Sequence, residues 1–265
     1  DFYWERGDDK TLTCDAAKDV ASNYLPPTSP DIQHVVINSL AQHQLEERKG
    51  VAARVVPNIF DFDAPAWAKD DFNSDFRASI GLEENDLLVL QATRIVARKG
   101  IELAIDLVRE IQAQRTILEE ERLFDGRRFS PENRIVLVLA GYARDDATGE
   151  YVRKLKEKAA TDGVELLFIE DWIANERGEQ NGHKVYSLWD TYVFADLVTY
   201  PSLWEGWGNQ LLEAVRAKLP LMLFEYPVYT ADIGKKDLKV VSLGNVLAGY
   251  DENDLARIAP DVLDA

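Results

Sequence analysis

The sequence predicts an α/β fold built on a doubly wound parallel sheet. Two observations carry this prediction. Runs that are apolar almost throughout, such as residues 86–95 and 134–143, alternate with longer stretches such as 100–114, in which apolar residues recur at helical spacing. Strands with two apolar faces are typical of parallel sheets that helices cover on both sides.

The first elements of this alternation lie in the N-terminal quarter of the chain. The run 32–38 predicts a strand, and Ser39 is the expected N-cap of a helix that ends near Lys49, before Gly50. A short strand opens the segment 53–65, whose Pro and Asp residues then predict turns.

The middle of the chain contains the strand–helix unit twice. The run 86–95 predicts a buried strand and 100–114 the helix that follows it. The run 134–143 and the stretch 150–160 form the second unit. Because the intervening segment 115–133 is rich in charge, we expect it to be a surface excursion.

The last third of the chain continues the same alternation. Strands are expected at 164–169, 195–202 and 219–226. Helices are expected near 184–194 and 208–217, between these strands.

The Pro- and Asp-rich segment 57–65 is the expected boundary between two domains. Residues 1–60 hold too few strands to close a sheet, so we expect them to be the C-terminal part of an incomplete N-terminal domain. Residues 61–265 hold the remaining strands and form the second domain.

Composition excludes several classes of protein. The 265 residues carry a net charge of −17 and show no cluster of Lys and Arg, so no nucleic-acid partner is expected. The single cysteine, Cys14, fits a reducing cytoplasm, where we place the protein. The apolar runs are far shorter than the roughly 20 residues that span a bilayer, so no transmembrane segment is expected.

The stretch PSLWEGWGNQLLEA, residues 201–214, lies between a predicted strand and a predicted helix. Ligands of open parallel sheets bind beyond the carboxyl ends of the strands, where the free amides of a helix N-terminus favour an anion such as a phosphate. Gly206 and Gly208 can adopt backbone angles closed to other residues and admit a ligand to the main chain. Glu213 suits the vicinal hydroxyls of a ribose or hexose, and Glu205 stands on the other side of the same pocket.

A capped surface helix with two solvated acids is the competing explanation. It is weak, because Glu213 would need Gln210 as its cap and Gln is a poor cap. A second motif, TRIVARKG at 93–100, also lies where a strand ends and a helix begins. It places Arg94 and Lys99 five residues apart, which suits a diphosphate because Arg offers a planar fork and Lys a point charge. The alternative here is a pair of solvated basic residues beside a turn.

These motifs together resemble the retaining glycosyltransferases of family 4, which belong to the group 1 glycosyltransferases. PSLWEGWGNQLLEA resembles their Glu-x7-Glu signature, TRIVARKG their Arg and Arg-Lys-Gly segment, and VVPNIFDF their Pro-Asn hinge between domains. The resemblance covers residues 32–234. It implies a GT-B architecture of two Rossmann-like domains, in which residues 61–265 form the C-terminal domain that binds the nucleotide-sugar donor.

The resemblance also implies a role for each candidate residue. Arg94 and Lys99 would hold the donor diphosphate and stabilise the leaving nucleoside diphosphate. Glu205 would lie beside the donor sugar, and Glu213 would accept hydrogen bonds from the ribose hydroxyls. The backbone that would cradle the sugar end is that of Gly206, Trp207, Gly208 and Asn209. The implied reaction moves a hexose from a nucleotide-diphosphate sugar to an unknown acceptor with retention of anomeric configuration.

No cofactor and no metal are expected. The family does not depend on an Asp-x-Asp metal site, the three His lack metal-ligand spacing, and the acid pairs at 8–9, 70–71 and 145–146 are expected at the surface. A fragment that binds the nucleotide sugar without turnover is the alternative function. A Rossmann oxidoreductase is disfavoured because no G-x-G-x-x-G follows an early strand, and a sugar phosphorylase because no phosphate or cofactor-lysine site is identifiable.

Overall fold

The computed structural model describes residues 23–24, 26–120, 122–123, 125–144, 146, 148–236 and 238–263. Cys14 and the acids Asp8, Asp9 and Asp145 lie outside these residues. The chain forms two compact units. Unit 1 comprises Asp1–Phe60, Glu205–Asn209 and Pro227–Leu238, and unit 2 comprises Asp61–Trp204, Gln210–Tyr226 and Lys239–Ala265.

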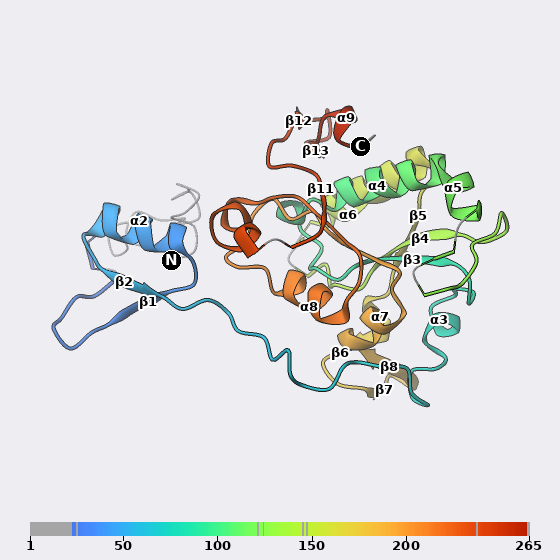
Figure 1. Cartoon of the computed structure of the whole chain (residues 1–265), viewed down its shortest axis with the longest axis horizontal. Helices are drawn as coiled ribbons and strands as arrows, with labels where there is room; N and C mark the ends of the chain where they lie inside the picture. Colours follow the sequence, from blue (N-terminus) through green and yellow to red (C-terminus); the bar gives the residue numbers. More distant parts are fainter. Residues whose placement is uncertain are drawn as a thin grey trace. The chain divides into compact units, whose positions relative to one another are not determined.

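Unit 2 is built on a six-stranded sheet in which every neighbouring pair of strands is parallel (Figure 1). Across the sheet, the strands are β11 (Val241–Ser242), β10 (Leu221–Leu223), β9 (Leu197–Tyr200), β3 (Leu87–Gln91), β4 (Ile135–Leu139) and β5 (Glu165–Phe168). Every residue of β3 and β4 is buried, as their unbroken apolar runs predict. The α/β fold with a parallel sheet is therefore confirmed.

Helices cover both faces of this sheet (Figure 1). The helices on one face are α4 (Ile101–Ala113), α5 (Arg115–Glu120) and α6 (Glu150–Asp162), and those on the other are α7 (Leu188–Phe194) and α8 (Asn209–Ala217). The buried side of α4 presents Ile101, Ile105 and Val108 to the core, which are the residues at helical spacing in the sequence. None of the described helices is long and apolar enough to cross a membrane.

Short elements complete unit 2. They are α3 (Phe76–Ser79), the 3-10 turns η2 (Ala97–Lys99) and η3 (Glu170–Trp172), the three-stranded sheet of β6 (Ile173–Ala174), β8 (His183–Ser187) and β7 (Gly178–Gln180), the antiparallel pair β12 (Gly249–Tyr250) and β13 (Ala256–Arg257), and α9 (Pro260–Leu263).

One expectation for unit 2 needs correction. The helix expected near 184–194 begins only at Leu188, because the preceding residues form strand β8. Ser187 and Asp190 form a capping box that fixes this start. The segment 115–133 lies mostly at the surface, as expected, and its first residues form helix α5.

In unit 1, a parallel pair of strands, β1 (His34–Val36) and β2 (Ala53–Val55), flanks helix α2 (Ser39–Lys49). The expected N-cap was wrong by one residue. Asn38 is the cap, and its Oδ1 accepts a hydrogen bond from the Ala41 amide at 2.6 Å. The unit also contains the one-turn π-helix η4 (Tyr229–Ile233) and the 3-10 turn η5 (Gly234–Lys236).

The order of the strands determines where unit 2 can bind a ligand. From β3 the chain runs outward through β4 and β5, and it then returns to place β9 on the other side of β3. The connections that leave the carboxyl ends of β3 and β9 therefore lead to helices on opposite faces of the sheet, α4 and α8. The point between two such strands is called the switch point, and in open α/β sheets it is the usual position of a ligand crevice.

Candidate functional site

A cavity of about 710 Å³ opens at the carboxyl ends of β3 and β4, in unit 2. This volume is typical of sites for small molecules. Residues after these strands, around η3, in β7 and at the starts of α7 and α8 line it: Ala92, Arg94, Ala140, Gly141, Tyr142, Arg144, Glu170, Ile173, Ala174, Asn175, Gln180, Leu188, Trp189, Gln210 and Glu213. Two of the residues predicted from the sequence, Arg94 and Glu213, are thus in one cavity.

Close backbone contacts hold the loop after β3 in place. A Cβ atom on Gly141 would lie 1.8 Å from the carbonyl oxygen of Thr93, so the loops after β3 and β4 touch without any side chain between them. The Ile95 amide also donates to the Tyr142 carbonyl at 2.9 Å. Backbone contacts at Thr93 and at Ile95 therefore hold the main chain on both sides of Arg94.

The same loop is joined to the segment that follows β9. Gly100 has a φ of 58°, and a Cβ atom there would lie 2.4 Å from the carbonyl oxygen of Pro201. The Leu203 amide donates to the Arg98 carbonyl at 2.9 Å, and Arg98 Nη1 donates to the Trp204 carbonyl at 3.0 Å. The TRIVARKG motif and residues 201–204, which begin the second motif, are therefore held side by side at the switch point.

Lys99 lies on η2 and is almost fully buried, with 3% of its surface exposed. Its Nζ atom lies 5.7 Å from the centroid of the Tyr200 ring. Its positive charge is close enough to Glu213 to favour the ionised form of that carboxyl group. Lys99 does not line the cavity itself, so the structure places its charge behind the cavity wall.

Glu213 lies on the second turn of α8 and is 7% exposed. Its Oε2 atom accepts a hydrogen bond from the hydroxyl of Tyr192 at 2.7 Å. Burial raises the pKa of the Glu213 carboxyl above its usual value, while the Tyr192 hydrogen bond and the charge of Lys99 oppose this rise. Such a perturbed acid in a cavity is a candidate for a functional residue.

The predicted residues Glu205, Gly206, Trp207, Gly208 and Asn209 belong to unit 1. Of the two glycines, only Gly208 has a left-handed backbone, with a φ of 115°. Gly206 does not adopt such a conformation.

Gly206 is instead held through its carbonyl oxygen, which accepts from Asn38 Nδ2 at 2.7 Å. The Asn209 Oδ1 atom accepts from Asn58 Nδ2 at 2.6 Å. The amide of Ser39 donates to Asp232 at 2.7 Å within the same unit. Gly206 and Asn209 are thus hydrogen-bonded to the start of α2 and to the Pro-Asn hinge.

Sequence reasoning missed several residues of the cavity in unit 2. Glu170 and Arg144 face each other at 3.7 Å, and Glu170 Oε2 accepts from the Ala143 amide at 3.3 Å. Tyr192 was missed as the partner of Glu213. No spacing in the sequence pointed to these residues, because each depends on a loop or on a side-chain contact between distant segments.

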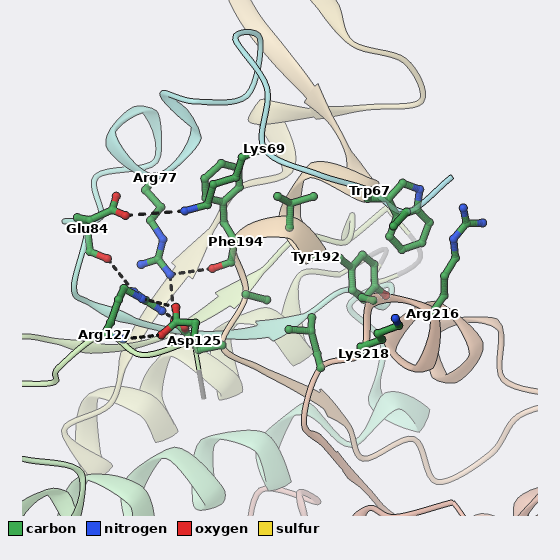
Figure 2. A pocket seen from close by; sticks show the side chains of 16 residues that line it. Trp67, Lys69, Arg77, Glu84, Asp125, Arg127, Tyr192, Phe194, Arg216 and Lys218 are labelled. Atoms are coloured by element: carbon green, nitrogen blue, oxygen red, sulfur yellow. Dashed lines mark hydrogen bonds and ion pairs between the residues drawn. The ribbon is translucent and has the colours of Figure 1, made fainter. Parts of the chain in front are cut away.

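A second cavity of about 490 Å³ lies near the amino ends of β9 and β10, away from the carboxyl ends of the sheet. Arg77 and Arg127 are on one side of it, and Trp67 and Arg216 on the other (Figure 2). Most of its charged side chains have a local partner: Arg77 pairs with Asp196 at 3.0 Å, and Arg216 Nη1 donates to the carbonyl of Asp61 at 2.8 Å. The charged side chains of this cavity are therefore best explained as structural contacts and not as parts of a ligand site.

Within the part of the chain that the structure describes, no group of three or more His, Cys, Asp or Glu side chains could hold a metal ion. Asp70, one of the acids expected at the surface, is half-exposed and pairs with Arg177 at 2.6 Å.

Comparison with known proteins identifies the family. A family model described as glycosyl transferases group 1 matches residues 72–263. The chain is 45% identical over 248 residues to the mannosylglucosylglycerate synthase of Petrotoga mobilis, covering 92% of this chain and 55% of that protein. It is 38% identical over 265 residues to the mannosylglucosylglycerate synthase of Thermotoga maritima, covering 99% of this chain and 58% of that protein. The chain thus spans little more than half the length of these relatives.

A solved structure supports the fold. WaaG, a glycosyltransferase involved in lipopolysaccharide biosynthesis, matches with a TM-score of 0.54 at 15% identity, covering 98% of this chain and 60% of that chain. This likeness agrees with the GT-B fold expected from the sequence. Because the family model covers most of the chain, and the parallel sheet carries the motifs in the expected order, the chain belongs to the group 1 glycosyl transferases.

Proposed function

We propose that the chain is the donor-binding part of a retaining glycosyltransferase of family 4. The observation that supports this most directly is the single cavity lined by Arg94 and Glu213, with the charge of Lys99 behind its wall. A cation and a buried acid in one cavity suit the two parts of a nucleoside diphosphate: the diphosphate and the ribose diol.

The names of the two curated relatives suggest the substrates. Both proteins are mannosylglucosylglycerate synthases. We therefore propose that the hexose is mannose, carried by a nucleoside diphosphate, and that the acceptor is glucosylglycerate. The whole protein would supply the acceptor contacts together with this chain.

The proposed chemistry relies on stabilising the leaving group. Departure of a nucleoside diphosphate from the anomeric carbon develops negative charge on phosphate oxygens, which fixed cations and amides stabilise. In this proposal Arg94 and Lys99 take this role. As the sequence resemblance implies, Glu205 and the backbone of residues 206–209 would bind the donor sugar. No protein nucleophile and no metal take part in the proposed reaction.

Other sequence predictions stay predictions. These are the assignment of residues 1–60 to an incomplete acceptor-side domain, the donor-binding role of residues 61–265, and the cytoplasmic location. The alternative function is a nucleotide-sugar binding fragment without turnover of its own. Calorimetry with GDP-, UDP- and ADP-sugars, followed by a transfer assay, separates the two functions. Absence of binding to all three donors by the folded chain at millimolar concentration would contradict both.

Replacing Arg94 by alanine should weaken binding of the nucleoside diphosphate by about 1.5–3 kcal/mol, the range for a hydrogen bond to a charged group. Binding of the bare nucleoside should change little, because it lacks the diphosphate. Calorimetry with both ligands measures the difference. Equal losses for the two ligands would mean that Arg94 acts through the fold and not on the diphosphate.

Glu213→Gln and Glu205→Gln should differ in which property they change, nucleotide binding or kcat. Glu213→Gln should weaken binding of every ribonucleoside diphosphate, because the amide accepts less strongly from the ribose diol. Glu205→Gln should leave this binding nearly intact and, in the full-length protein, lower kcat. Binding measurements on this chain and steady-state kinetics on the full-length protein test the pair. If neither change alters donor binding or turnover, the site assignment is wrong.

A further inference from the structure

Tyr192 lies on α7 and is 2% exposed. Its hydroxyl group donates to Glu213 Oε2 at 2.7 Å, from one helix to the next. In the part of the chain that the structure describes, no other group donates a hydrogen bond to Glu213. The position of this carboxylate therefore depends on one tyrosine hydroxyl.

The ring of Tyr192 is held by aromatic neighbours. Trp67 and Trp189 stack with their centroids 4.4 Å apart, and the Tyr192 centroid lies 5.8 Å from Trp67 and 6.4 Å from Trp189. Tyr192 lines the second cavity (Figure 2), whereas its partner Glu213 lines the first. Tyr192 therefore spans the wall between the two cavities, and its hydroxyl group cannot move without displacing packed rings.

The charges around this pair favour a hydrogen bond in which Tyr192 donates and Glu213 accepts. Burial and the neighbouring charge of Glu213 raise the pKa of Tyr192 well above its usual value, so the phenol keeps its proton and donates. The Tyr192 hydrogen bond and the charge of Lys99 both favour the ionised form of Glu213, against the effect of burial. With Oε2 engaged by Tyr192, Oε1 is the oxygen left to face a ligand.

We propose that Tyr192 is a positioning residue for donor binding, which acts through Glu213 by holding its carboxylate so that Oε1 accepts from the ribose diol. This inference rests on the proposed function, since it assumes that Glu213 binds a ribose. Tyr192 itself touches no part of the donor. Loss of the Tyr192 hydroxyl should thus weaken the binding only of ligands that carry the diol.

The main test compares Tyr192→Phe with the wild-type chain, using GDP, UDP and ADP and the 2′,3′-dideoxy form of each. For the ribonucleotide that binds the wild type most tightly, the variant should bind about tenfold more weakly, as expected when a hydrogen bond to a charged group is lost. The dideoxy form should bind both proteins equally. A purely structural role would weaken both ligands alike, and that result would overturn the proposal.

A matched control and a double variant sharpen this test. Tyr186→Phe removes another buried tyrosine hydroxyl, which contacts Ser79 and Asp75 and not the cavity, so it should leave nucleotide affinity unchanged. In a Glu213→Gln background, Tyr192→Phe should cause no further loss of affinity, because the two residues act as one unit. Additive losses in this cycle would overturn the proposal.

The pH dependence gives an independent readout. Loss of the Tyr192 hydrogen bond should raise the pKa of Glu213 further, because burial then acts against Lys99 alone. The ratio of variant to wild-type dissociation constants should therefore fall as the pH rises and Glu213 in the variant becomes ionised. Taking the ratio removes the titration of the nucleotide itself. A ratio that does not change with pH would contradict this step.

The outcomes separate this inference from the proposed function. If no ribonucleotide binds the wild type, or if Glu213→Gln leaves binding unchanged, the proposed function fails. If Glu213→Gln weakens binding and Tyr192→Phe does not, only the role of Tyr192 fails.

Discussion

Asp196→Ala should lower the free energy of unfolding of this chain by about 3–5 kcal/mol, the effect of removing one partner from a buried ion pair. The side chains of Asp196 and Arg77 are 4% and 6% exposed, and their charged atoms lie 3.0 Å apart. Removing the carboxylate leaves the Arg77 guanidinium buried without its counter-charge. The same change deprives the Leu88 amide of its acceptor, Asp196 Oδ2 at 2.8 Å.

Urea denaturation measures this effect, and an exposed ion pair supplies the control. Arg153 and Glu157 lie one helical turn apart with 57% and 58% of their side chains exposed. Glu157→Ala should change the free energy of unfolding by no more than about 0.5 kcal/mol, because solvent already screens this pair. A loss for Asp196→Ala no larger than for Glu157→Ala would show that the buried pair contributes nothing beyond a surface pair.

Gly141→Ala should be the most damaging single change at the candidate site. The new Cβ atom would lie 1.8 Å from the Thr93 oxygen and 2.9 Å from the Arg94 nitrogen, and neither backbone atom can rotate away. The loops after β3 and β4 must then separate. We expect a loss of about 3 kcal/mol in the free energy of unfolding, at the upper end of the usual range for overpacking.

Because the clash reaches the backbone of Arg94, nucleotide binding should suffer as well. We expect a loss in affinity of at least about tenfold for the nucleoside diphosphate, as when a hydrogen bond to a charged group is lost. Gly178→Ala is the matched control. No atom lies within 4 Å of a Cβ added at Gly178, and its φ is not in the left-handed range. Unchanged stability and affinity in Gly141→Ala would refute the description of these loops as fixed.

The central sheet could be predicted from the sequence because its strands are apolar on both faces. β3 and β4 are buried throughout, and short runs that are apolar throughout are more typical of buried strands than of helices. The start of α7 was predicted too early, because Val185 and Tyr186 suit a strand as well as a helix. The pair Ser187 and Asp190 was the signal that fixes the true start.

The candidate site could be predicted only in part. Arg94 and Glu213 follow predictable strand ends, and the rule for parallel sheets brings such ends together. The partner of Glu213 could not be predicted, because a buried Tyr192 has the same pattern as any core aromatic residue. The burial of Lys99 could not be predicted from the sequence either, because it depends on how the loop around η2 packs.

The pairing of β3 with β9 has a consequence for how the protein folds. The Leu88 amide and the Asp196 carboxylate that join these two strands are 108 residues apart, and strands β4 and β5 and helices α4, α5, α6 and α7 are among the elements in between. Contacts between such distant segments form slowly, because the intervening chain must first be ordered. The ligand cavity therefore depends on the pairing in this sheet that spans the largest number of residues. During refolding, helical structure should appear before the ability to retain a nucleotide.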